Sequence, residues 1–195
     1  MKGRITILFV FAALAVGCGQ GKKAEQFKAL PFPDVQLPSM ISGQQEALEY
    51  MAVNYWNGIT DPSRSYPSDS LLVSGVRRGD VEQKFADWTS IMEYAGNGIW
   101  SKAVGNLYDR ALACERKDTA SQVFETFVDL FQKYYYDPNS PMRNEDVYYH
   151  FVSRYASYEG LTDVEKAKYE REARLCALNR IGTRASDFRF ADRRG

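Results

Sequence analysis

Apolar residues recur every three or four positions along most of this chain, which is the spacing of an amphipathic α-helix. Residues that can cap a helix precede five of these stretches. The expected caps are Ser42 with Gln45, Asp80 with Gln83, Asp118, Asn144, and Thr162 with Glu165. Glycine and proline end the stretches near residues 58, 96, 138 and 160. The pattern predicts an all-α fold over residues 42–181, a multi-helix bundle of about six antiparallel helices joined in part by short connections.

The sixth expected helix, which begins after Thr162, is mostly charged. Its Lys, Glu and Arg side chains lie four residues apart, and each such pair adds only a few tenths of a kcal/mol. Packing of this helix is therefore expected to come from Val164, Leu175 and Leu178. A polar helix at this place in the chain suggests a bridge between two domains.

Two segments depart from the helical pattern. Residues 60–79 form a long stretch rich in Ser, Asp, Pro and Gly, expected to be a loop that is either functional or mobile. In residues 182–195, Phe188 and Phe190 alternate with polar residues, which predicts a short C-terminal strand with one buried face. A lone strand has no pairing partner, so this strand is expected to open a further domain.

The N-terminus has the pattern of a bacterial lipoprotein signal. Lys2 and Arg4 precede the apolar run 5–16, which rises only about 18 Å as a helix and is too short for a hydrocarbon core of about 30 Å. Leu14 to Cys18 resembles a lipobox, although a cleaved signal with a chance cysteine is the alternative. We expect a signal peptide over 1–17 and a lipid anchor and linker over 18–41, with lipidated Cys18 as the link to the membrane. The predicted location is the cell envelope, lipid-anchored and facing the periplasm.

Charge limits the class of partner. The chain has 25 basic and 25 acidic residues and no net charge, whereas a surface that reads nucleic acid normally carries a basic excess. We therefore expect no nucleic acid partner, and a protein or a small molecule instead.

Short motifs add a family resemblance. The stretches Asn54–Asn57 and Phe85–Trp88 resemble an uncharacterised helical domain that precedes a thioredoxin-like domain in bacterial lipoproteins. Leu178–Thr183 and Ala185–Phe190 resemble the junction between those two domains, with Ile181 in place of the usual proline. The resemblance implies that 182–195 begins a truncated thioredoxin-like domain.

The same resemblance limits what this chain can do by itself. The family's thiol-disulfide chemistry uses a Cys-x-x-Cys pair, and this chain has only Cys18, Cys114 and Cys176. We expect no catalytic, cofactor-binding or metal-binding residues. The expected function is a non-catalytic helical accessory domain that recruits or positions substrates, with a thioredoxin-like domain of the full-length protein or protein thiols as partners.

Three groups of residues remain as candidate sites. Cys114 and Cys176 could form a disulfide, although two buried, unpaired thiols are the favoured interpretation. Asp146, His150 and Arg154 share one helix face, where a surface or interhelix histidine is favoured over a general base or half a metal site. The candidate binding surface consists of four tyrosines in the aromatic-rich helices: Tyr135, Tyr136, Tyr149 and Tyr158. They support the alternative function, a free-standing periplasmic or surface lipoprotein that binds a peptide or glycan.

Overall fold

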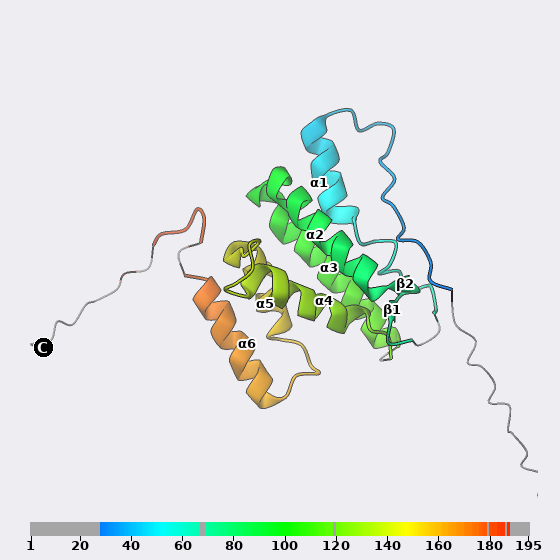
Figure 1. Cartoon of the computed structure of the whole chain (residues 1–195). Helices are drawn as coiled ribbons and strands as arrows, with labels where there is room; N and C mark the ends of the chain where they lie inside the picture. The colour runs from blue at the N-terminus through cyan, green and yellow to red at the C-terminus, as the bar shows by residue number, and fades with distance from the viewer. Residues whose placement is uncertain (1–27, 67–68, 119, 179, 186, 188–195) are drawn as a thin grey trace, which may run out of the picture.

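The computed structural model describes residues 28–66, 69–118, 120–178, 180–185 and 187. This part of the chain is mostly helical, with six α-helices, one short π-helix and one two-stranded sheet (Figure 1). The elements are α1 (Gln44–Asn54), β1 (Leu72–Val73), β2 (Val76–Arg77), α2 (Arg78–Ala95), α3 (Asn97–Lys117), α4 (Val123–Phe131), η1 (Gln132–Tyr136), α5 (Glu145–Tyr155) and α6 (Asp163–Cys176). None of the helices in these ranges is both long and apolar enough to cross a bilayer.

Two of the five expected helix caps are confirmed. The Asn144 side chain accepts a hydrogen bond from the Val147 backbone N–H, 3.1 Å away. Thr162 and Glu165 form a reciprocal capping box at the start of α6. These two side chains fix where α5 and α6 begin.

The other three caps are wrong. Ser42 lies one residue too early, because α1 is preceded by Gly43 and has no side-chain cap. Helix α2 begins at Arg78, before Asp80, because β2 runs directly into it. Asp118 ends α3 instead of starting α4, since its N–H bonds to the Cys114 carbonyl oxygen.

The expected loop 60–79 contains a hairpin that the sequence did not reveal. Strands β1 and β2 pair antiparallel, with Val73 opposite Val76. Ser74 and Gly75 make the turn with φ angles of 48° and 77°, the left-handed geometry that two-residue hairpin loops prefer. The Ser74 hydroxyl donates to the Ile59 carbonyl oxygen, 2.6 Å away. This hydrogen bond joins the hairpin turn to the segment that follows α1.

Residues 30–35, which the sequence predicts to be part of the linker 18–41, pack on the folded domain. Leu30 forms a parallel bridge with Val76, and the Phe32 ring lies edge-on to Trp56 at 5.6 Å between centroids. A Cβ atom on Gly58 would overlap the ring of Pro33, so only glycine allows this approach. The linker therefore joins the folded domain near residue 30.

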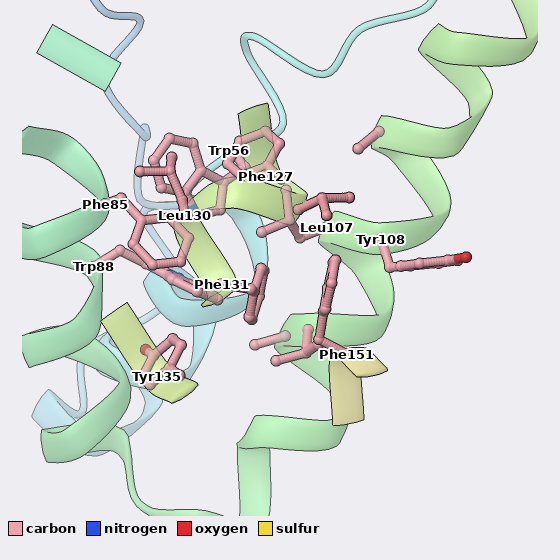
Figure 2. Close-up of a cluster of buried hydrophobic side chains, with 14 of the residues drawn as sticks. Trp56, Phe85, Trp88, Leu107, Tyr108, Phe127, Leu130, Phe131, Tyr135 and Phe151 are labelled. Carbon is pink, nitrogen blue, oxygen red and sulfur yellow. The ribbon is translucent and has the colours of Figure 1, made fainter. Parts of the chain in front are cut away.

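A cluster of aromatic side chains forms the core (Figure 2). Trp56 meets Phe127 edge-on at 4.8 Å, and the rings of Phe131 and Phe151 stack at 4.2 Å with an interplanar angle of 9°. Trp88 is fully buried, and its indole N–H donates to the Ala52 carbonyl oxygen. These contacts join α1 and the residues after it to α2, α4 and α5, so one core is shared by helices from the start and the end of the domain.

Helix α6 packs mainly on α5, but not through the residues that we expected. Val164 is 80% exposed, Leu175 47% and Leu178 48%. The buried residues of α6 are Tyr169, Glu172 and Cys176, which lie on one helix face at spacings of three and four. Because this buried face includes the charged residue Glu172, the spacing of apolar residues could not show which face of α6 is buried.

Candidate functional site

An open depression of about 500 Å³ lies where η1, the start of α5 and the end of α6 meet. Its lining combines one aromatic ring, two leucines and several charged groups. The lining residues are Tyr136, Arg143, Asn144, Glu145, Asp146, Leu175, Cys176 and Leu178.

An aromatic stack and a buried hydrogen bond fix the position of Tyr136, which lines this depression. The Tyr136 ring stacks on Tyr148 at 4.5 Å, and the Tyr148 hydroxyl donates to Glu172 Oε2 at 2.8 Å. Burial and the neighbouring Glu172 carboxylate raise the pKa of Tyr148, so the hydroxyl keeps its proton. Tyr136 is the last residue of η1, and π-helical turns are frequent at functional sites.

Beside the depression, Arg180 joins three side chains of α5. We call Asp146, Tyr149, His150 and Arg180 the Arg180 cluster. The guanidinium lies 3.2 Å from His150 Nε2 and 3.5 Å from Asp146 Oδ1, and its carbon lies 4.0 Å from the Tyr149 ring centroid. The Ile181 backbone N–H also donates to Asp146, at 3.4 Å. The chain that follows α6 is therefore attached to the face of α5.

The cluster leaves His150 unsuited to act as a general base. Burial lowers its pKa first, and the positive charge of Arg180 lowers it further, against the opposite effect of Asp146. A neutral ring can accept from the guanidinium at Nε2 only if its own proton is on Nδ1. Its basic nitrogen is thus already engaged, so His150 positions Arg180.

The two described thiols are free, buried and unreactive. Burial raises the pKa of Cys176 to about 12, and the carboxylates of Glu145 and Glu172 act in the same direction. Burial also raises the pKa of Cys114. Because the thiolate is the nucleophile, neither cysteine is activated at neutral pH.

The four candidate tyrosines do not form one binding surface. Tyr135 is a core residue with 3% exposure, so its place on a surface was wrong. Tyr136 lines the depression and Tyr149 lies under Arg180, whereas Tyr158 packs on the Phe124 ring at 4.9 Å.

The histidine face is only partly as expected. Asp146 and His150 both contact Arg180, whereas Arg154 pairs with Asp109 of α3, at 3.4 Å. Arg180 is a site residue that the sequence did not indicate, because it lies thirty positions after its partner His150. Cys18, Phe188 and Phe190 lie outside the described residues.

The described residues line other surface depressions but hold no cluster of metal ligands. Among residues 28–187, outside the gaps given above, no group of three His, Cys, Asp or Glu side chains could hold a metal ion. Two further open depressions, of about 410 and 380 Å³, share Pro141 and Met142 in their linings. The depression at the C-terminal end of α6 is the one that adjoins the Arg180 cluster, through Asp146, and for this reason we take it as the candidate functional surface.

Comparison with known proteins agrees with the expected resemblance to an uncharacterised helical domain related to thioredoxin-like proteins. The family model of a domain of unknown function, DUF5106, matches residues 16–179. The crystal structure of a thioredoxin-like protein from Bacteroides caccae ATCC 43185 is similar, with a TM-score of 0.65 and 25% sequence identity. The similarity covers 83% of this chain and 53% of the other, so this chain spans about half the length of that protein. No curated protein matches the sequence.

Proposed function

This chain belongs to the DUF5106 family, and we propose that it is the non-catalytic helical domain of a bacterial lipoprotein that also carries a thioredoxin-like domain. In this role the six helices, taken as an antiparallel bundle, recruit or position substrates for thiol-disulfide exchange. The reactive Cys-x-x-Cys pair belongs to the second domain.

The observation that carries the proposal is the unequal coverage of the structural match. Most of this chain aligns with only half of a thioredoxin-like protein. Residues 178–190 resemble the junction that leads into such a domain. The remaining half is the natural place for the redox pair, because both described thiols of this chain are buried and protonated.

The anchor sets the distance from the membrane. If Cys18 is lipidated, the segment from Gly19 to Leu30 can span at most about 40 Å when fully extended. Leu30 is already bound to the hairpin through its bridge to Val76. The helical domain would therefore work within one protein diameter of the periplasmic membrane surface.

Reading the gene beyond codon 195 tests whether a thioredoxin-like domain follows the helical domain. We expect the frame to continue into a thioredoxin-like domain with a Cys-x-x-Cys pair. The purified full-length protein should then catalyse reduction of insulin by dithiothreitol and lose this activity when either cysteine of that pair is replaced by serine.

Two variants of the described thiols provide the controls. Cys114→Ser and Cys176→Ser should retain insulin reduction, after correction for any loss of folded protein measured by circular dichroism. A frame without a Cys-x-x-Cys pair, or activity that depends on Cys114 or Cys176, contradicts the proposal.

The alternative function, a free-standing lipoprotein with a tyrosine-lined groove, has no specific support. Of the four tyrosines expected on its binding surface, Tyr135 lies in the core, Tyr136 stacks on Tyr148, and Tyr158 packs edge-on against Phe124.

A further inference from the structure

Three exposed apolar residues lie at the end of α6 and in the turn that follows it. Leu175, Leu178 and Ile181 succeed one another at intervals of three residues, and Ile181 is 62% exposed. We call these residues the α6 apolar face. Leu175 and Leu178 also line the 500 Å³ depression, so the face has a hollow beside it.

The chain leaves the helical domain at a fixed point next to this face. Arg180 is held by Asp146 and His150, and Gly182 turns the chain with a φ of 81°. The turn is closed by Thr183, whose backbone N–H and hydroxyl both donate to the Arg180 carbonyl oxygen, at 3.0 and 2.8 Å. A simple flexible linker would need none of these contacts.

We propose that the α6 apolar face is the docking surface for the thioredoxin-like domain of the same polypeptide, and that the Arg180 cluster sets where that domain sits. This inference rests on the function proposed above. It adds the place of contact and the device that orients it.

The size of the face favours an attached domain over a second copy of this chain. Three half-exposed aliphatic residues present on the order of 300 Å² of surface. A stable complex of separate proteins buries about 800 Å² on each partner. A domain joined by a short segment is present at an effective millimolar concentration, so a small apolar contact is enough to hold it.

The test uses the full-length protein and the double variant Leu175→Gln/Leu178→Gln. Val164→Gln is the matched control, because Val164 is an exposed apolar residue at the other end of α6. Small-angle X-ray scattering should show a larger radius of gyration and a two-lobed distance distribution for the double variant only. Hydrogen exchange of the amides at 175–178 should become at least ~tenfold faster in the double variant, because the covering domain is released. Circular dichroism should be unchanged in both variants, since the replaced side chains are exposed in the helical domain.

The possible results separate this inference from the function that it rests on. If the double variant scatters and exchanges like Val164→Gln, the docking surface is wrong, while insulin reduction by the full-length protein still supports the proposed function. If light scattering gives a dimer that the double variant dissociates, the occupant is a second copy and the inference is overturned. If insulin reduction is absent from the full-length wild type, the proposed function itself fails.

Discussion

A buried tyrosine hydroxyl can stabilise or destabilise the fold, depending on whether it has a hydrogen-bond partner, and Tyr148 and Tyr135 show the two cases. Tyr148 donates to the buried carboxylate of Glu172 at 2.8 Å. The hydroxyl of Tyr135 is buried and has no hydrogen-bond partner among the described residues. A buried polar group without a partner opposes folding, whereas a hydrogen bond to a charged group favours it.

We predict that Tyr148→Phe lowers the free energy of unfolding by about 1–3 kcal/mol, because Glu172 Oε2 then loses its buried hydrogen bond and keeps only the longer ion pair with Lys168. Tyr135→Phe should leave that free energy unchanged or raise it. Urea denaturation followed by circular dichroism measures both variants, which differ from the wild type by one oxygen atom each. Equal losses in the two variants would contradict this assignment of their hydroxyls.

His150 should make the domain less stable in mild acid. Burial and Arg180 lower its pKa in the folded state below the ordinary 6.5, with Asp146 opposing and Arg154 adding to the decrease. The unfolded chain then binds more protons below pH 6.5, so folding stability is complete above that pH and is lost as the pH falls toward the folded-state pKa. We expect the free energy of unfolding to fall between pH 7.5 and 5.5, and to fall less in His150→Gln. A drop of the same size in His150→Gln would assign the effect to other groups.

At the scale of elements, the two ends of the helical region provide a matched pair of caps. Thr162 makes a capping box with Glu165, whereas Ser42 has the same sequence pattern but α1 starts without a side-chain cap. We predict that Thr162→Ala lowers the free energy of unfolding by about 1 kcal/mol, the usual effect of losing an N-cap. Ser42→Ala should change it by less than about 0.5 kcal/mol, as surface substitutions generally do. Hydrogen exchange should show the loss as faster fraying of the first turn of α6.

The N-terminal segment should behave as part of the domain. Phe32 contacts both Tyr55 and Trp56 at 5.6 Å, and Lys84 lies 5.6 Å from its ring centroid. We predict that Phe32→Ala lowers the free energy of unfolding by roughly 1–3 kcal/mol, because a half-buried ring is lost from the edge of the core. The more exposed Leu37 is the control, and Leu37→Ala should have a much smaller effect. A similarly small effect of both substitutions would indicate that residues 30–35 belong to the linker and not to the folded domain.

The sequence predicted elements well where the information is local. Six amphipathic stretches gave six helices, and caps were found where a side chain bonds its own helix, as at Asn144 and Thr162. The hairpin was missed because its strands have two residues each and one of them also pairs with the distant Leu30.

The candidate site shows the same limit. Arg180 reaches residues of α5 about thirty positions earlier, and the spacing of side chains along one element cannot reveal such a contact. The buried face of α6 was missed for a related reason. Glu172 is buried because Tyr148 on another helix satisfies its carboxylate.

At the scale of the whole molecule, the proposed function puts the lipid anchor before the helical domain and the thioredoxin-like domain after it. The folded domain begins near Leu30, close to the expected anchor, and its exit at Arg180 is fixed on α5 beside the α6 apolar face. A thioredoxin-like domain docked there would keep one orientation relative to the helices. Such an arrangement favours substrates that approach from one side.

This arrangement depends on lipidation at Cys18. The apolar run 5–16 is too short to span a hydrocarbon core of about 30 Å, so the proposed attachment is through acyl chains. More than one chain on Cys18 would exceed the requirement for lasting membrane binding. We predict that the wild type incorporates an alkyne-labelled fatty acid in cells and fractionates with membranes, and that Cys18→Ser loses both properties. Cys114→Ser should remain labelled, since its thiol is buried. Membrane attachment that persists in Cys18→Ser would leave the signal peptide as an ordinary secretion signal and would remove the lipid anchor from the proposed function.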